Sequence, residues 1–492
     1  MRRPLLLATC LLVCLGCDDA GGEDAGPGTD AGPQPDAGTA TDAGPRTDAG
    51  PGTDAGGTDA GPPPAPEGWA PQPWEDCEGG GRTLEAGPSD YRDVLSTLAA
   101  GDTLRLQPGT YTRGLPLRTS GADGQCIVIE PLDLNDRPRF EGSDAFNIVA
   151  VHGASWIKVR GLDIDGLGRA GFGVASQGGT DQPTHHIVIE DLTMVGLGAN
   201  QQITGVSTKS PAWDWVIRGN RITGAGTGMY LGNSDGNQPF IRGVVELNTV
   251  RDTIGYNLQI KHQNPRPALD GIPGDGSETL IRWNVFSKQS GASSGGSARP
   301  NLLLGHYPTS GPGQNDRTLV YGNFLYDNPT ENLMQAEGNV AVYNNVFVNP
   351  NGGALNIQPH NDVPRVTDVF WNTIVANGRG IRVTGGDSAF AQRVRYNAVF
   401  SPMPISADDE SGNVTGGISA PEVVDATSAP GAGLDLHPAG TALEMSVDVG
   451  ELPDVPFRMR DFEGRERMGA FVGAYAGAGG GALVLEARLY GE

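Results

Sequence analysis

Six short apolar segments between residues 229 and 385 carry the side chains best suited to chemistry. If each segment is a strand, alternation turns its first and third residues inward and its second and fourth residues outward. The segments read MYLGN from Met229, LQIKH from Leu258, LLLGH from Leu302, LMQAE from Leu333, LNIQP from Leu355 and IRVTG from Ile381. Their fourth positions are Gly232, Lys261, Gly305, Ala336, Gln358 and Thr384. Lys261 is the one charged residue of this column, with a glycine on each side.

The fifth positions place His262, His306 and Glu337 on three successive segments. Histidine and glutamate are suitable metal ligands, so one interpretation is a metal site. The other is a hydrogen-bonded stack at a turn. For Lys261 the alternatives are a catalytic base and a solvated charge without a chemical role.

A repeated asparagine motif predicts the elements that hold these segments. Two or three alternating residues, an Asn and an apolar pair recur at Asn220, Asn248, Asn284, Asn323, Asn345, Asn372 and Asn397, and Gly161 and Asp191 take the same place in two earlier units. A spacing near 22 to 30 residues with short strands is typical of a solenoid in which each repeat is one coil. A propeller blade needs about 40 to 50 residues, and the 22 residues from Asn323 to Asn345 are too few. We expect the Asn amides to form a structural ladder along the coils.

Two consecutive repeats are longer than one coil, which predicts loops beside the candidate residues. The extra residues lie at 264–278, 287–298 and 308–316, all rich in Gly, Ser and Pro. Loops inserted on one part of a solenoid commonly build its binding site. Residues 251–320 hold seven basic and five acidic side chains, whereas residues 67–492 carry a net charge of −17. The surroundings of these loops are therefore locally basic, while the acidic whole excludes nucleic-acid binding through its overall field.

The N-terminal region predicts export. Arg2 and Arg3 precede an apolar stretch ending in Cys14-Leu15-Gly16-Cys17, which resembles a bacterial lipoprotein signal with Cys17 lipidated; ordinary cleavage nearby is the alternative. Residues 18–66 repeat Asp-Ala-Gly almost without large apolar side chains, as expected of a disordered spacer. Cys77 and Cys126 then remain as a pair. In an oxidising compartment we expect them to form a disulfide, two unrelated buried thiols being the other interpretation.

These observations predict an all-β chain, a right-handed parallel β-helix built as a single-stranded solenoid with an N-terminal capping helix. The domains are a signal at 1–17, a linker at 18–66, a cap and first coils at 67–150, a β-helix core at 151–405 and a closing segment at 406–492. The predicted location is the bacterial cell envelope, with a lipid anchor in the outer membrane or at the cell surface. The first 16 residues are the one long apolar stretch and are too short to span a bilayer.

Two stretches resemble known secreted proteins. "DVLSTLAAGDTLRLQPGTYT" resembles the N-terminal cap of pectate-lyase-like β-helices, and the closing "DFEGRERMGAFVGAY" also resembles such proteins. The order LQIKH, IRWNVFSK, LLLGH, VYGNF is similar to that in the chondroitinase B and alginate lyase family of polysaccharide lyases. In this resemblance Lys261 matches the family's base and His306 its histidine. The family's Arg falls on Gly305, and its acidic calcium ligands fall on Ile254 and Tyr256.

The resemblance implies cleavage of a uronate-containing polysaccharide by β-elimination. Lysine serves as the base where nearby positive charge lowers its pKa. We predict Lys261, His306 and Arg299 as catalytic residues, with Arg299 or Arg266 replacing the family's Arg and His306 or Tyr307 as the acid. Substrate contacts are predicted for His262, Arg266, Tyr307, Gln259 and Glu337.

Other functions remain open at this point. Calcium could bind Asp270, Asp275 and Glu278, although such loop acids are usually solvated. A glycoside hydrolase would need two facing carboxylates, for which Glu331 and Glu337 are available. A non-catalytic glycan-binding or adhesive protein is the third alternative. For all of these functions, we expect the partner to be a polysaccharide. We also expect the protein to be a monomer.

Overall fold

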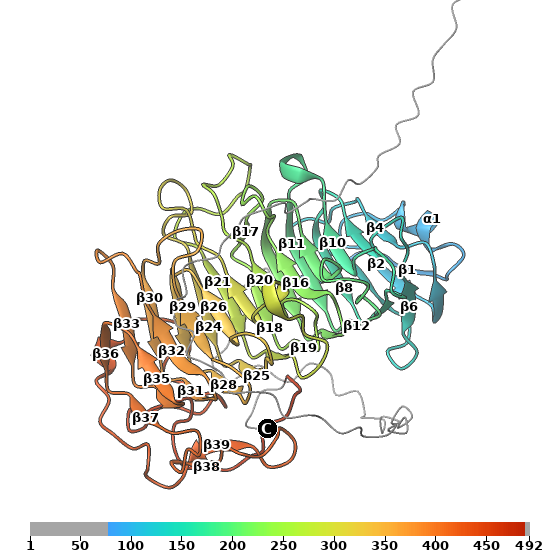
Figure 1. Cartoon of the computed structure of the whole chain (residues 1–492). Helices are drawn as coiled ribbons and strands as arrows, with labels where there is room; N and C mark the ends of the chain where they lie inside the picture. The colour runs from blue at the N-terminus through green and yellow to red at the C-terminus, as the bar shows by residue number, and fades with distance from the viewer. Residues whose placement is uncertain (1–76, 488–492) are drawn as a thin grey trace, which may run out of the picture. The chain divides into compact units, whose positions relative to one another are not determined.

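The computed structural model of the chain describes residues 77–487. Their coils form a right-handed parallel β-helix, in which successive coils add one strand to each of three parallel sheets (Figure 1). The predicted fold class is therefore confirmed. The predicted signal, the whole predicted linker and Cys17, the predicted lipidation site, lie outside the described residues. Within the described part, no helix is both long and apolar enough to cross a membrane.

Sheet A carries the strands that precede the Asn turn. In spatial order it contains β1 (Thr83–Ala86), β2 (Thr103–Leu106), β5 (Ile127–Pro131), β8 (Ser155–Arg160), β11 (Thr184–Glu190), β14 (Ala212–Arg218), β18 (Val244–Glu246), β21 (Glu278–Arg282), β24 (Arg317–Tyr321), β27 (Val340–Tyr343), β30 (Thr367–Phe370), β33 (Gln392–Arg395) and β36 (Asp409–Ser411), with β17 (Phe240–Ile241) also paired to β14.

Sheet B follows the Asn turn. It contains β3 (Gly109–Tyr111), β6 (Pro138–Glu141), β9 (Asp163–Asp165), β12 (Thr193–Val195), β15 (Arg221–Thr223), β19 (Thr249–Arg251), β22 (Val285–Ser287), β25 (Phe324–Tyr326), β28 (Val346–Asn349), β31 (Thr373–Ala376), β34 (Ala398–Phe400) and β37 (Val414–Gly416).

Sheet C holds the six segments that carry the candidate residues. It contains β4 (Leu115–Leu117), β7 (Val149–Val151), β10 (Val174–Ser176), β13 (Thr204–Thr208), β16 (Thr227–Leu231), β20 (Leu258–Ile260), β23 (Leu302–Leu304), β26 (Met334–Ala336), β29 (Leu355–Ile357), β32 (Arg379–Val383) and β35 (Met403–Ser406).

The Asn ladder forms as predicted and extends one coil further, to Asn413. Asn284 Nδ2 donates to Asn323 Oδ1 at 2.9 Å, and Asn323 Nδ2 donates in turn to Asn345 Oδ1 at 2.9 Å. The residue before the Asn adopts a left-handed backbone even where it is bulky, with φ 55° at Trp283. Such a conformation costs about 1–3 kcal/mol, and the buried amide hydrogen bonds of the ladder hold it in place.

The alignment of the two earliest repeats was wrong by one residue. Sheet pairing sets Glu190 opposite Arg218, and the Leu192 backbone N–H donates to Asn220 Oδ1 at 3.0 Å. Leu192, and not Asp191, therefore occupies the Asn position. The pairing of β11 with β8 likewise moves that position from Gly161 to Leu162. Buried leucines replace the amide in these coils.

The first and last described segments pack differently on the coils. The short helix α1 (Tyr91–Leu95) lies at the N-terminal end of the coils (Figure 1), with Tyr91 and Leu95 buried. A disulfide joins Cys77 to Cys126, as predicted. The C-terminal segment includes the antiparallel pair β38 (Val423–Asp425) and β39 (Asp435–Pro438). It then runs back along the coils, so that the Ala487 backbone N–H donates to Thr249 Oγ1 at 2.8 Å.

Candidate functional site

The outer face of sheet C presents two registered columns of side chains. Met229, Leu231, Leu258 and Ile260 are buried in the core, so the residues between and after them face outward. Pairing aligns the first column as Tyr230, Gln259, Leu303, Gln335, Asn356 and Arg382. Gln259 lies in this column as predicted, but only 5% of its surface is exposed.

Lys261 stands in the second column, directly after β20. Its Nζ lies 5.7 Å from the centroid of the Tyr230 ring, within cation–π range. Gly232 and Gly305 occupy the same column on the two neighbouring coils, because the Lys261 and Gly305 backbone N–H groups continue the ladder to Leu231 and Ile260. The predicted glycine on each side of the lysine is therefore confirmed by the register.

Gly305 also explains why the resemblance lacks an arginine at this place. A Cβ built at Gly305 would lie 2.2 Å from the backbone nitrogen of His262, a distance that real Cβ contacts do not show. The backbones of the two coils approach too closely here for any side chain at residue 305. An arginine in the family's position is thus excluded by the local geometry of this chain.

Lys209 is a site residue that the sequence analysis missed. It follows β13 in the same column as Lys261, two coils nearer the N-terminus. Its Nζ lies 5.3 Å from the Phe172 ring centroid and 5.7 Å from that of Tyr230. The Tyr230 ring therefore has an ammonium group over it from the coils on both sides. Aligning VSTK at 206–209 with MYLG at 229–232 would have found this lysine.

The two histidines lie on adjacent coils, as predicted. The rings of His262 and His306 stack with centroids 5.4 Å apart and an interplanar angle of 18°. His306 Nδ1 lies 3.0 Å from the Tyr307 carbonyl oxygen, which can only accept, so Nδ1 carries the proton of this hydrogen bond. Burial, followed by the charges of Lys261 and His306, lowers the pKa of His262 to about 4. His262 is therefore neutral at pH 7.

Glu337 does not belong to this histidine stack. Pairing sets Leu302 opposite Met334, and so Glu337 follows β26 level with Gly305 and Lys261. The predicted fifth position for Glu337 was thus wrong by one residue. Glu337 is buried, accepts a hydrogen bond from the Asn361 backbone N–H at 3.0 Å, and has a pKa raised by burial.

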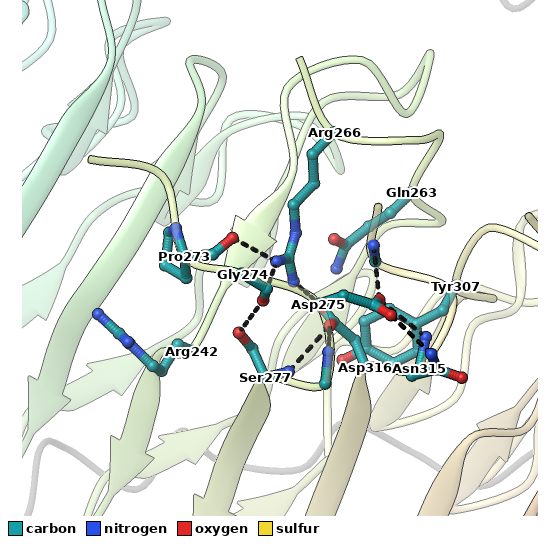
Figure 2. A network of polar contacts seen from close by, with 12 residues as sticks. Arg242, Gln263, Arg266, Pro273, Gly274, Asp275, Ser277, Tyr307, Asn315 and Asp316 are labelled. Carbon is teal, nitrogen blue, oxygen red and sulfur yellow. Dashed lines mark hydrogen bonds and ion pairs between the residues drawn. The ribbon is translucent and has the colours of Figure 1, made fainter. Parts of the chain in front are cut away.

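Arg266 and Tyr307 lie in the long loops, within the polar network drawn in Figure 2. Arg266 donates to the carbonyl oxygens of Pro273 and Gly274 and pairs with Asp316, and both charged side chains are 2% exposed. Tyr307 is 5% exposed and its hydroxyl is hydrogen-bonded to the Thr318 hydroxyl at 2.8 Å. The network locks the loop after β20 to the loop after β23, so these residues support the site without contacting substrate in this conformation.

Arg299 lies at the opposite edge of sheet C from Lys261. It precedes β23, whereas Lys261 follows the neighbouring β20. Its guanidinium donates to the carbonyl oxygens of Gly296 and Ala298 at 3.0 and 2.8 Å and lies 5.9 Å from the Tyr256 ring centroid. The structure therefore does not bring Arg299 and Lys261 together.

The predicted calcium loop is organised by its own hydrogen bonds. Asp275 Oδ1 accepts from the Gly313 and Asn315 backbone N–H groups at 2.9 and 3.1 Å. Among residues 77–487, no three His, Cys, Asp or Glu side chains are grouped so that they could hold a metal ion. The Asp275 carboxylate serves to join the loops, and we assign no metal ligands to this loop.

Comparisons with known proteins found matches among solved structures only. No protein-family model matches the sequence, and no curated protein matches it. An alginate lyase from Paenibacillus sp. is 15% identical, with 68% of this chain and 95% of that chain covered and a TM-score of 0.35. Pectate lyase Pel9A is 13% identical, with 81% and 97% covered and a TM-score of 0.42. A lacto-N-biosidase from Eubacterium ramulus is 11% identical, with 68% of each chain covered and a TM-score of 0.38.

Several of the chains that the comparison found are polysaccharide lyases. The fold assignment itself rests on the register of the three sheets.

Proposed function

We propose that this protein binds a uronate-containing polysaccharide along the outer face of sheet C and cleaves it by β-elimination. The observation that carries the proposal is the position of Lys261. Its ammonium group stands on an outward column with glycines on both sides, next to a histidine pair and an aromatic ring. This arrangement offers a base, an acid and a surface for a sugar ring within a few coils.

The two ammonium groups over Tyr230 favour an anionic substrate. Lys209 and Lys261 are two coils apart, about 10 Å at the usual strand spacing. Along a chain of uronates, each lysine can meet a different carboxylate, while the Tyr230 ring between them contacts a sugar. The described domain is strongly acidic overall, so a local pair of lysines on one face marks where a polyanion can approach.

The reaction assigns one proton transfer to each end of the breaking bond. In its neutral amine form, Lys261 Nζ takes the proton from C5 of the uronate, and the electron pair of that C–H bond forms the C4–C5 double bond. The C4–O bond breaks, and the departing oxygen takes a proton from the protonated His306 through Nε2, because Nδ1 already donates to the Tyr307 carbonyl. General base catalysis of this kind contributes about 10²–10⁴ in rate.

The arrangement of carboxylates favours the lyase over a hydrolase. Glu331 precedes β26 and accepts hydrogen bonds from the Asn332 backbone and side chain at 2.8 and 2.7 Å. Glu337 follows the same strand and is buried. The two carboxylates therefore lie at opposite edges of sheet C, and they do not face one another across a sugar.

We further propose that the protein acts at the cell envelope, held by a lipid on Cys17 and separated from the membrane by residues 18–66. The support is the export-signal pattern of the first 17 residues and the apolar-poor repeat that follows it.

The test is a screen of the purified protein against alginate, pectate and glycosaminoglycans. Ultraviolet absorbance of the unsaturated uronate products is expected from one of these polymers. New reducing ends without that absorbance would instead indicate a hydrolase, and binding without products would indicate a non-catalytic glycan-binding protein; either result contradicts the lyase.

A further inference from the structure

A second basic site lies on the outer face of sheet C, toward its C-terminal coils. It is a pocket of about 360 Å³ lined by Asn332, Leu355, Asn356, Arg379 and Arg382. Asn356 and Arg382 belong to the same outward column as Tyr230 and Gln259. The pocket therefore opens on the face that carries Lys261.

The charges of this pocket are not neutralised by the protein. Arg382 Nη1 donates to Asn356 Oδ1 at 3.2 Å and to Gln358 Oε1 at 2.5 Å, both neutral amide oxygens. Arg379 is exposed. Within residues 77–487, neither arginine forms an ion pair with a carboxylate. On sheet A of these coils the pattern is the opposite, because Arg317 and Arg393 both pair with the buried Asp368.

Two arginines without carboxylate partners suit an anionic ligand. A guanidinium binds a carboxylate through two parallel hydrogen bonds, and such charge-assisted bonds are roughly twice as strong as neutral ones. The neutral amides of Asn332 and Asn356 add donors and acceptors for hydroxyl groups. The lining thus fits a sugar unit that carries a carboxylate.

The distance to Lys261 relates this pocket to the proposed reaction. From β20 to β32 the register passes through four coil steps, about 19 Å at the usual strand spacing. This is the separation along the helix axis. Asn332 and Arg379 lie where the strands of sheet C begin, whereas Lys261 follows β20, so a polysaccharide that reaches both must cross the sheet obliquely and would meet the pocket several sugar units away.

We propose that Arg379 and Arg382 form a distal subsite for a uronate carboxylate of the same polysaccharide chain that reaches Lys261. This inference rests on the proposed function and deepens it, because it predicts that long chains bind more tightly than short ones. The gain comes from a second anchoring point on one ligand.

The experiment measures binding in the Lys261→Ala background, which prevents turnover. Disaccharides and octasaccharides of mannuronate and of galacturonate are titrated by calorimetry into Lys261→Ala, Lys261→Ala/Arg382→Ala and Lys261→Ala/Arg113→Ala. Arg113 is exposed and lies before β4, at the other end of the coils, so it is the matched control. Loss of the Arg382 contact should weaken octasaccharide binding about tenfold. Disaccharide binding and the Arg113 control should not change.

The outcomes separate this inference from the proposed function. Three results would overturn the distal subsite. The octasaccharide affinity could be equal with and without Arg382, the Arg113 control could show the same loss, or neither octasaccharide could bind. The lyase activity of the wild-type protein is decided separately by the absorbance screen. A length-dependent loss on Arg382→Ala together with no product from the wild-type protein would keep the subsite and refute the lyase.

Discussion

Replacing Asn284 by alanine tests whether the Asn ladder holds the coils together. Asn284 is 1% exposed and lies in the middle of the ladder. Its Nδ2 donates to Asn323 Oδ1 and to the Val245 and Arg282 carbonyl oxygens at 2.9, 2.9 and 3.0 Å. Its Oδ1 accepts from the backbone and side-chain nitrogens of Asn248 at 3.0 and 2.9 Å. Alanine removes all five hydrogen bonds and leaves the Asn248 backbone N–H without this acceptor.

The expected cost follows from these contacts. A buried donor left without a partner costs about 1–3 kcal/mol, and each further hydrogen bond contributes about 1 kcal/mol net. The three oxygens that accept from Asn284 Nδ2 each lose only one hydrogen bond, which is the smaller part of the cost. We therefore expect the free energy of unfolding to fall by about 4 kcal/mol. Equilibrium urea unfolding followed by tryptophan fluorescence measures this change.

Asn413 provides the matched control. It ends the ladder, is only partly buried, and accepts from the backbone and side-chain nitrogens of Asn397 at 2.9 and 3.0 Å. Water can replace its partners, so Asn413→Ala should cost less than half as much. A loss below about 1 kcal/mol for Asn284→Ala, or an equal loss for both variants, would refute the structural role of the ladder.

Three further predictions concern stability and the site. Cys126→Ser removes the disulfide to Cys77, which closes a loop with a sequence separation of 49, and should lower the free energy of unfolding by about 4 kcal/mol. Chemical denaturation measures this difference. The difference between the two proteins should vanish under reducing conditions. Burial, and next the neighbouring charges, lowers the pKa of His185, His186 and His262 from 6.5 to about 4. At these three sites the unfolded chain therefore binds more protons between pH 6.5 and 4, and their contribution to the free energy of unfolding should fall as the pH drops through this window; the same slope in His262→Gln would contradict the assignment for that residue. Gly305→Ala should reduce activity at least tenfold because its Cβ would collide with the His262 backbone, whereas Gly296→Ala, with open space around it, should remain active in the absorbance assay. Full activity in Gly305→Ala would show that the two coils at Gly305 and His262 can move apart without loss of function, which would contradict this prediction.

The coils were predictable from sequence wherever an asparagine marks the turn. Asn needs its amide to bridge successive coils, so its position identifies the register without further information. Leucine replaces asparagine at residues 162 and 192, and the residues before them, Gly161 and Asp191, looked like the better match to a turn position. The shift at Glu337 has a similar cause, because Leu333 and Met334 are both apolar and both buried. Alternation alone cannot choose between two such residues.

The chemistry of the site was predictable only in part. Lys261, His262 and His306 follow strands of recognisable pattern, and the register confirms their neighbourhood. Arg266 looked available for substrate, but its loop folds back so that Asp316 and two carbonyl oxygens enclose it. Contacts between long loops depend on backbone conformations that residue types do not determine. Lys209 was missed because its coil lacks the Asn signature that aligned the later ones.

The rate of β-elimination by Lys261→Ala tests the central claim most directly. The wild-type protein and the variant are assayed by product absorbance on the polymer that the screen identifies, with Arg113→Ala as the control. We predict that Lys261→Ala loses at least 10²-fold in kcat, as expected for removal of a general base, while its urea unfolding curve stays unchanged. Wild-type kcat in Lys261→Ala would contradict the account, because the proton at C5 would then be taken by another group.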